Sequence, residues 1–409
     1  MNTYLVGGSV RDSLINDIHG TDIQSNDKDY CVVGSSMNEM ISLGYTFVGK
    51  DFPVFLHPET KDEYALARRE RSTGGGHSDF ITELSDVTLD EDLLRRDLSV
   101  NSIAYDEDSG DYIDPHGGID DIRKKVLRHT SDAFREDPVR VLRLARFRAT
   151  LGTDWKIAHA TKALCYDMRV TLTSLTPERI WKEVEKALLL PNSRVFFETL
   201  LELNILGYVF PVLEPMVLCK EGSKHHRESS VFEHTMMMLD VVHDKSLEIK
   251  TAVLFHDVAK PHCYKYFGSS AGHASPVYFA PLLPNWLPKK LLGTTLFLVE
   301  NHTKIYKTHE MTAKTIATFL AKYKTSQMLE DQLTLAHADD AGRLADPGVS
   351  KEIEYTLIRD TWTKIKAYSP WEWIKDELVR NRTPSGEAIR QNVHSYNIQV
   401  VKEIFKKDK

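Results

Sequence analysis

The pattern of the sequence changes near residue 137, and this change limits the possible folds more than any other feature. Up to residue 136, short runs rich in β-forming residues, such as 30–33 and 52–56, are separated by Gly, Asp and Asn turns. From Asp137 onward, apolar residues recur at the spacing of one helix face. The sequence therefore predicts an α+β chain, with a mixed β-sheet and flanking helices over residues 1–136 and helices alone after them.

Two helix starts and a connector suggest how the helical part is divided. Asp137 precedes Pro138 and Thr176 precedes Pro177, so each pair offers a capping side chain followed by proline in the first turn. Residues 210–224 are typical of a connector, and a helical region with many histidines follows. We expect four parts, at residues 1–136, 137–224, 225–345 and 346–409, the last a charged helical tail.

Length and composition are those of an ordinary globular protein. The 409 residues are 42% hydrophobic and 27% charged, which suggests two to four domains. The four cysteines lie far apart without a CxxC pair, which argues against disulfides and against a cysteine zinc site. No window approaches the ~20 apolar residues that span a bilayer, and the N-terminus lacks the pattern of a signal peptide. We therefore expect a cytoplasmic protein without a membrane partner.

The distribution of charge matters more than its sum. The net charge of −7 disfavours nucleic-acid binding, but residues 121–150 hold nine Lys and Arg against four Asp and Glu. A local basic stripe can bind phosphates even on an acidic protein. The global charge therefore does not decide the class of partner.

Two glycines mark a candidate phosphate-binding turn. Gly7 and Gly8 follow a predicted strand at residues 4–6 and precede a predicted helix. Backbone N–H groups at such a turn can approach a phosphate closely, the helix N-terminus is positive, and Arg11 adds charge. The alternative is an ordinary structural turn.

A pair of carboxylates precedes the next apolar strand. Asp27 and Asp29 run into the strand predicted at residues 30–33, and residues two apart on a strand point to the same face. Mg²⁺ binds through one or two carboxylates together with substrate phosphates, and paired metals can clamp both oxygens of a phosphoryl transfer. The alternative is a solvated turn.

Four further stretches carry a resemblance to a known family. They read DFPVFLHP at 51–58, EYALAR at 63–68, RRDLSVNSIA at 95–104 and EDPVRVLR at 136–143. With the glycine and aspartate motifs, they resemble the class II tRNA nucleotidyltransferases, the CCA-adding enzymes, and in particular the bacterial multifunctional type with an HD domain. The resemblance implies a nucleotidyltransferase head, a helical neck and body, and a helical HD domain, with tRNA, CTP and ATP as substrates.

The resemblance also implies roles for single residues of the head. Asp27 and Asp29 match the metal-binding aspartates, which would hold Mg²⁺, and Glu63 matches the place of a third carboxylate in related poly(A) polymerases. Gly8 and Arg11 match contacts to the nucleotide phosphates. Asp97 matches a contact to the sugar region.

The motif at Asp137 offers a physical explanation for base selection. Cytosine and adenine both present an amino donor beside an unprotonated ring nitrogen, which fits a carboxylate from Asp137 next to a guanidinium from Arg140. Guanine and uracil would leave buried polar groups unpaired, which costs several kcal/mol. Arg143, one turn further, could reach the triphosphate. The alternative is a capping aspartate in an i,i+3 ion pair with Arg140.

A second set of candidate ligands lies in the histidine-rich region. The tandem pair His256-Asp257, with His234 before it and Asp339 after it, resembles the HD phosphohydrolases. Histidine and carboxylate bind transition metals or Mg²⁺, and such a site would activate water against a phosphoester. His273 and His302 are possible additional ligands.

The remaining expectations concern RNA binding and two loops. Basic residues between Arg123 and Arg148, with Arg179 and Lys182, would contact the tRNA backbone. Residues 69–77 are expected to form a mobile loop of the kind that helps relatives switch from C to A addition, and residues 18–26 a surface excursion.

Two other functions compete with CCA addition. The first is a poly(A) polymerase or an enzyme that adds only A or only C. The second is a phosphohydrolase whose head only binds tRNA. The oligomeric state stays open.

Overall fold

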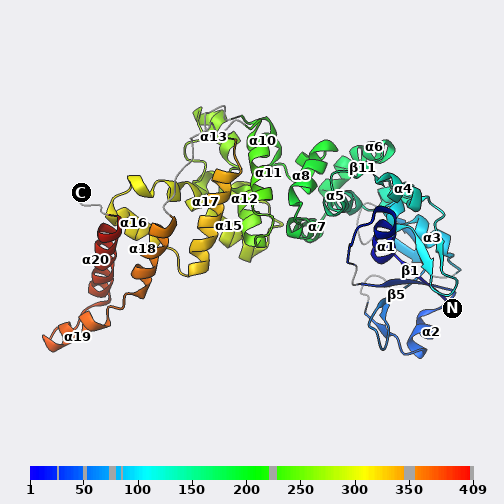
Figure 1. The fold of residues 1–409 in the computed structure, drawn as a ribbon, viewed down its shortest axis with the longest axis horizontal. Coiled ribbons are helices and arrows are strands. Elements are labelled where there is room, and N and C mark those ends of the chain that lie inside the picture. Colours follow the sequence, from blue (N-terminus) through cyan, green and yellow to red (C-terminus); the bar gives the residue numbers. More distant parts are fainter. Residues whose placement is uncertain are drawn as a thin grey trace. The chain divides into compact units, whose positions relative to one another are not determined.

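The computed structural model describes residues 1–24, 27–48, 53–72, 80–83, 86–220, 228–344 and 355–405. The chain divides into two units, Met1–Pro211 and Val212–Lys409 (Figure 1). The predicted fold class is confirmed: a mixed sheet with flanking helices comes first and helices alone follow. The finer division into four parts stays a prediction.

A seven-stranded mixed sheet forms the centre of the first 113 residues. Its order is β3-β4-β5-β2-β1-β8-β9, with β2 parallel to β5 and every other pair antiparallel. The strands of this sheet are β1 (Asn2–Val6), β2 (Asp29–Val33), β3 (Thr46–Phe47), β4 (Val54–Leu56), β5 (Glu63–Leu66), β8 (Ala104–Asp106) and β9 (Asp111–Ile113). Two small sheets pair β6 (Arg69–Ser72) with β7 (Phe80–Glu83) and β10 (Val126–Leu127) with β11 (Lys156–Ile157).

Strand β2 lies inside the sheet because its side chains are apolar on both faces. Cys31 packs on one face with Val6 and Leu93, and Val32 packs on the other with Phe55. Alternation along a strand sends successive side chains to opposite faces. The α-helices of this unit are α1 (Gly8–His19), α2 (Met37–Ser42), α3 (Leu89–Leu94), α4 (Gly118–Lys124), α5 (Val139–Leu151), α6 (His159–Asp167), α7 (Pro177–Leu189), α8 (Ser193–Glu202) and α9 (Leu206–Val209), with 3₁₀ turns at Ser99–Asn101, Asp132–Glu136 and Met168–Ser174.

Both predicted helix starts are present, with details the sequence did not show. Helix α5 begins at Val139, and the Asp137 carboxylate accepts the Val139 N–H at 3.1 Å. Helix α7 begins at Pro177 with Thr176 at the N-cap, but the Thr176 side chain makes no capping hydrogen bond.

The structure changes or only partly covers three segments that were expected to be loops, at residues 69–77, 18–26 and 210–224. Residues 69–72 form β6, because they pair antiparallel with β7, and only 73–77 of the expected loop lie outside the described residues. In the 18–26 segment, Asn16 holds the turn by accepting the Ile23 N–H at 2.8 Å, and residues 25–26 lie outside the description. The expected connector at 210–224 contains a short helix, α10 (Glu214–Leu218).

The second unit is helical throughout its described part. Besides α10 it comprises α11 (Val231–Val241), α12 (Leu247–Phe255), α13 (Lys260–Phe267), α14 (Pro276–Phe279), α15 (Lys289–Tyr306), α16 (Ala313–Leu320), α17 (Ser326–Ala341), α18 (Tyr355–Ala367), α19 (Trp371–Val379) and α20 (Gly386–Phe405), with 3₁₀ turns at Ala280–Leu282 and Thr308–Glu310. Among the described residues, no helix combines the length and apolar character needed to cross a membrane.

The C-terminal helices are built into the core of this unit. Figure 1 shows α20 beside α16 and α18, and all three helices share one apolar cluster. Ile358 on α18 and Val401 on α20 are completely buried against Leu320 and Tyr323. The expected charged tail is therefore charged only on its outer side, and its apolar side complements α16.

Candidate active sites

A pocket of about 890 Å³ opens at one end of the central sheet. The end of β1, the start of α1, strands β2 and β5, and helices α5 and α7 all contribute to its wall. Eight basic side chains line it: Arg11, Arg68, Arg95, Arg96, Arg140, Arg143, Arg179 and Lys182. Five acidic ones do so too: Asp29, Glu63, Asp97, Asp137 and Glu183. The excess of positive charge suits a polyanion.

The glycine turn forms the floor of this pocket. Gly7 has φ +78°, which glycine adopts without strain, and a Cβ there would lie 3.5 Å from Asp29 Oδ2 and 3.7 Å from Arg96 Nη1. Arg11 is buried, and its guanidinium donates to Asp12 Oδ1 at 2.8 Å and to Asn101 Oδ1 at 2.8 Å. The turn therefore brings together the glycine backbone, the fixed guanidinium of Arg11 and the carboxylate of Asp29.

The predicted metal carboxylates lie close together but not all on one strand. Strand β2 begins at Asp29, opposite Val6 at the end of β1, so Asp27 lies just before the strand rather than on it. Asp29 is in register with Glu63 on the parallel strand β5, and both line the pocket. Partial burial, with the negative charges of Glu63 and Asp27, raises the pKa of Asp29 although Arg96 opposes the shift. A cation would relieve this crowding of like charges.

Asp97 is a fixed anion inside the pocket. Its carboxylate accepts from Arg143 Nε at 2.7 Å, from Asn101 Nδ2 at 3.0 Å and from the Leu98 N–H at 2.9 Å. Burial alone would raise the pKa of Asp97, but Arg143 and these hydrogen bonds hold it well below its usual range. Arg143 is thereby directed into the pocket from α5.

The ion pair at Asp137 differs from the expected one. Arg179 Nη2 on α7 donates to both Asp137 oxygens, at 2.8 and 2.7 Å. Arg140 instead donates to the Ala133 carbonyl at 2.9 Å, and it lines the same pocket. The i,i+3 ion pair that the sequence allowed is replaced by a pair between two helices. Sequence reasoning placed Arg179 only among the RNA-binding cations.

The candidate residues of the first unit, Asp27 excepted, thus meet at one pocket. These are Gly8, Arg11, Asp29, Glu63, Asp97, Asp137, Arg140 and Arg143. Asp27 lies near enough for its charge to act on Asp29 but does not line the pocket.

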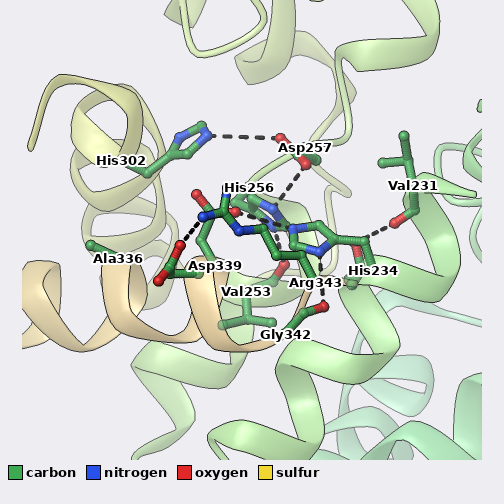
Figure 2. Close-up of polar contacts among 12 residues, drawn as sticks. Val231, His234, Val253, His256, Asp257, His302, Ala336, Asp339, Gly342 and Arg343 are labelled. Carbon is green, nitrogen blue, oxygen red and sulfur yellow. Dashed lines mark hydrogen bonds and ion pairs between the residues drawn. The ribbon is translucent and has the colours of Figure 1, made fainter. Parts of the chain in front are cut away.

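A second site lies inside the helical unit, and its six candidate ligands form two buried groups (Figure 2). The first group is His234, His256 and Asp339, and the second is Asp257, His273 and His302. Within each group the ligand atoms lie within 4.8 Å of one another. Among the described residues, no other set of three meets this criterion.

Backbone carbonyls fix the orientation of all four imidazoles. His234 Nδ1 lies 3.0 Å from the Gly342 oxygen, and the other three rings contact Val253, Ser270 and Val299 oxygens at 2.7 Å each. A carbonyl oxygen only accepts, so each Nδ1 carries the proton and each Nε2 lone pair is left as an acceptor. This is the arrangement of metal-bound histidines, whose second nitrogen is held by an outer partner.

The inward nitrogen atoms converge on two carboxylates. His234 Nε2 lies 3.2 Å from Asp339 Oδ1, and His256 Nε2 lies 3.0 Å from Asp257 Oδ2. His273 Nε2 lies 3.0 Å from Asp257 Oδ1. Within the part of the chain that is described, His256 Nε2 and both Asp257 oxygens are buried without a hydrogen bond of acceptable geometry. Buried polar atoms left in this way fit an ion at the centre.

Within this cluster, the surrounding charges favour an ionised Asp257 and a neutral His302. Burial would raise the pKa of Asp257, but His256 and Lys260 hold it well below its usual range. Burial, with the neighbouring His273 and His256, lowers the pKa of His302 to about 3. Burial would also lower the pKa of His256, but the nearby carboxylates raise it.

Two cations beside the cluster were missed by sequence reasoning. Lys260 Nζ lies 2.7 Å from Asp257 Oδ2, one turn along the same segment. Arg343, just after α17, is buried and pairs with Asp340. Lys260 follows Asp257 at i,i+3 spacing and could have been proposed from the sequence, but no local signal marks Arg343.

Two family models and several named relatives match this chain. The poly A polymerase head domain family matches residues 3–128, and the family described as a probable RNA and SrmB-binding site of polymerase A matches residues 154–217. The Multifunctional CCA protein of Shewanella frigidimarina is 38% identical over 98% of this chain and 99% of its own length. That of Mannheimia succiniciproducens is also 38% identical, over 94% and 96%.

Solved structures share the fold at lower identity. The Bacillus stearothermophilus CCA-adding enzyme in complex with CTP superposes with a TM-score of 0.64 and 21% identity, over 98% of this chain and 89% of that one. The CCA-adding enzyme in complex with ATP gives a TM-score of 0.60 and 19% identity, over 99% and 88%. With near-complete coverage of the curated relatives, the chain belongs to the multifunctional CCA protein family and is a nucleotidyltransferase of the CCA-adding type.

Proposed function

We propose that this enzyme adds or repairs the terminal CCA of tRNA from CTP and ATP, without a nucleic-acid template. The observation that carries the proposal is one basic pocket that holds a glycine turn, a carboxylate pair and the Asp137–Arg140 motif together. Relatives named Multifunctional CCA protein, which match over nearly their full length, support it.

The reaction is a phosphoryl transfer between oxygen atoms. The oxygen of the tRNA 3′ hydroxyl forms a bond to the α-phosphorus of CTP or ATP and its proton passes to solvent, while the α–β bridging bond breaks and pyrophosphate leaves with that electron pair. In this proposal the Gly8 backbone, Arg11 and Arg143 hold the triphosphate, and Asp97 positions Arg143 and the sugar. Positioning and charge stabilisation supply most of the catalysis in such transfers.

Asp27, Asp29 and Glu63 fit a divalent cation. Burial first, and then the negative charges of Glu63 and Asp27, raise the pKa of Asp29, and a cation would relieve this crowding of like charges. In our proposal Asp27 and Asp29 hold Mg²⁺, with Glu63 as a third carboxylate. When bound, Mg²⁺ lowers the pKa of the attacking hydroxyl and neutralises charge on the phosphates.

Base selection is assigned to Asp137 and Arg140. The Asp137 carboxylate accepts the amino group shared by cytosine and adenine, and the Arg140 guanidinium donates to the adjacent ring nitrogen. Arg179 fixes the Asp137 carboxylate in place through hydrogen bonds to both of its oxygens. A uracil or guanine edge presents the opposite donor and acceptor, so it leaves buried groups unpaired.

The buried histidine cluster is assigned a phosphohydrolase activity. Four oriented imidazoles and two carboxylates fit a divalent transition metal or Mg²⁺. We propose that it hydrolyses phosphomonoesters or 2′,3′-cyclic phosphates: a water oxygen bonds to phosphorus, the ester bond breaks, and the leaving oxygen takes a proton. The metal would supply a water of lowered pKa.

The competing functions make different products. A tRNA transcript without its CCA end is incubated with Mg²⁺ and each nucleotide singly and in combination. We expect two additions with CTP and a third only when ATP is present. A long tail from ATP alone would identify a poly(A) polymerase, addition of only A or only C would identify the single-nucleotide enzymes, and no extension would leave the hydrolase as the main activity. We also propose that the enzyme acts in the cytoplasm.

A further inference from the structure

The feature that the proposed hydrolase does not use is a buried arginine next to its ligands. Arg343 follows the end of α17, and its side chain is only 2% exposed. Figure 2 draws this side chain among the residues of the histidine cluster, and its guanidinium pairs with Asp340, the residue after the ligand Asp339. The preceding residue, Gly342, accepts from His234 Nδ1 at 3.0 Å, so the backbone at Arg343 is tied to a ligand of the cluster.

One nitrogen of this guanidinium has a partner and another does not. Arg343 Nη2 donates to Asp340, three residues earlier. Nη1 is buried and, within the described residues, has no hydrogen-bond partner. A buried donor of a charged group left unpaired is costly, and an exposed position would avoid that cost. An ion pair with Asp340 alone therefore does not explain why Arg343 is buried.

The location also argues against a purely structural role. A fixed positive charge next to metal ligands repels a cation, so the position of Arg343 lowers the affinity of the cluster for a metal ion. The same charge is favourable once an anion occupies the cluster. Guanidinium has the planar fork that matches two oxygens of a phosphoryl group.

We infer that Arg343 forms an anion subsite of the histidine cluster and binds a non-bridging phosphoryl oxygen of a phosphomonoester or cyclic phosphate through Nη1. Asp340 holds the other side of the guanidinium and directs it. Arg343 forms no covalent bond in the reaction, and its protons stay on it. This inference rests on the hydrolase activity proposed above.

The test compares Arg343→Gln, Arg343→Lys and the wild type with Asp340→Asn, which removes the ion pair but keeps the guanidinium. Each full-length protein is loaded with Mn²⁺. We measure p-nitrophenyl phosphate hydrolysis, its inhibition by inorganic phosphate, phosphate binding by calorimetry, and Mn²⁺ affinity. Extension of tRNA by CTP on the same preparations checks that the rest of the chain is intact.

We expect Arg343→Gln to raise the phosphate inhibition constant about 10- to 100-fold, the value of one charged hydrogen bond, with Mn²⁺ affinity kept or increased. Arg343→Lys should recover part of the loss, because it keeps the charge without the fork. Asp340→Asn should raise the phosphate inhibition constant less than Arg343→Gln does, because it keeps the guanidinium and removes only the carboxylate that directs it. An unchanged inhibition constant in Arg343→Gln would overturn the inference. So would parallel loss of Mn²⁺ affinity and thermal stability in Arg343→Gln and Asp340→Asn.

Failure of the hydrolase itself gives a different result. If the wild type does not hydrolyse the ester, calorimetry still tests whether Arg343 binds phosphate. Phosphate bound in the basic pocket of the first unit contributes equally to all variants, so a difference between them reports on the histidine cluster. A phosphate site removed by Arg343→Gln supports the anion subsite without the hydrolase. If the wild type has no such phosphate site, both the anion subsite and the hydrolase activity are overturned.

Discussion

Ion pairs hold the nucleotide pocket at the scale of single residues. Asp92, Asp97 and Asp137 each bind arginines that line the pocket, so the basic side chains are held by carboxylates, of which Asp92 and Asp97 are buried and Asp137 is half-buried. An arginine fixed in this way loses less conformational entropy when it binds a phosphate. These carboxylates therefore link the stability of the unit to the geometry of its site.

Stability in acid should depend on Asp92. Its carboxylate is 1% exposed and lies 2.5 Å from Arg95 and 3.0 Å from Arg96. Burial would raise the pKa of Asp92, but the two arginines hold it well below its usual range. The unfolded carboxyl has a pKa of about 3.9, so the stabilisation is complete above about pH 4 and is lost as pH falls through the lower folded value.

Asp92→Asn should therefore lower the free energy of unfolding at pH 7 by about 3–5 kcal/mol, as when one partner of a buried pair is removed. It should also flatten the decline of stability below about pH 4. Urea unfolding between pH 7 and pH 2.5 measures both. Asp120→Asn is the control, because its pair with Lys124 is exposed and worth about 0.5 kcal/mol. Equal effects of the two substitutions would contradict the argument.

Base discrimination should depend on Arg179. With Arg179→Ala, Asp137 loses the partner that orients it, so we expect kcat/KM for CTP to fall about 10- to 100-fold. The preference for CTP over UTP should shrink as well. Arg179→Lys should restore part of both.

The control for that prediction is Arg194→Ala, which removes an arginine from an ion pair with Glu198 on helix α8, outside the pocket wall. It should leave kcat/KM and the nucleotide preference near wild type. If Arg179→Ala slows CTP and UTP addition by the same factor, Arg179 serves stability and RNA binding but not selection.

Part of this residue-scale picture could be predicted from the sequence and part could not. The Asp137 carboxylate at the start of α5 follows from Asp before Pro, because the contact is local. Its partner Arg179 is 42 residues away, and the sequence offers many arginines of equal chemistry. Only packing of α7 against α5 chooses among them.

At the scale of elements, close approach of helices explains two positions that tolerate no side chain. A Cβ on Gly342 would lie 2.6 Å from Met238 Cγ and 2.8 Å from the Ala338 oxygen. Helix α17 thus ends against α11, and this contact places the Gly342 oxygen on His234. Gly118, at the start of α4, similarly approaches the Ser99 carbonyl.

Gly342→Ala should destabilise the second unit by about 1–3 kcal/mol, because the contacting atoms include backbone. Gly293→Ala on α15 is the matched control, since a Cβ there meets no atom within 4 Å. Alanine in a helix interior should instead stabilise by about 0.5–1 kcal/mol. Thermal unfolding of both variants measures the difference, and opposite signs are expected. A stabilising Gly342→Ala would contradict the packing argument.

The sequence predicted elements well where one pattern dominated. Strands β1 and β2 and helices α5 and α7 follow from apolar runs and proline positions. Strand β6 was missed because its residues, Arg69-Glu70-Arg71-Ser72, are polar and pair only with β7. Helix α10 was missed because five residues carry too little periodicity.

At the scale of the whole molecule, the two sites lie in different units and use different ligands. The nucleotide pocket is lined by residues 6–183, and the histidine cluster by residues 234–339. The resemblance named all six cluster residues, whereas spacing alone could not gather them from segments about a hundred residues apart. The two cations beside them became visible only in the structure.

The two activities should therefore be separable. Asp29→Asn should reduce CTP addition at least about 100-fold and leave phosphoester hydrolysis unchanged, because the carboxylate acts only in its own pocket. Asp257→Asn should do the reverse. Both activities are measured on each preparation, and loss of both in either variant would contradict independent sites unless circular dichroism shows unfolding.

The burial of α20 against α16 has a consequence for synthesis on the ribosome. Every residue that lines the nucleotide pocket has been made by residue 183, so this half can fold while the chain is still growing. The second unit cannot complete its core until Val400 and Val401 have left the exit tunnel. A message cut short near its end would yield chains that still extend RNA but cannot assemble a stable hydrolase.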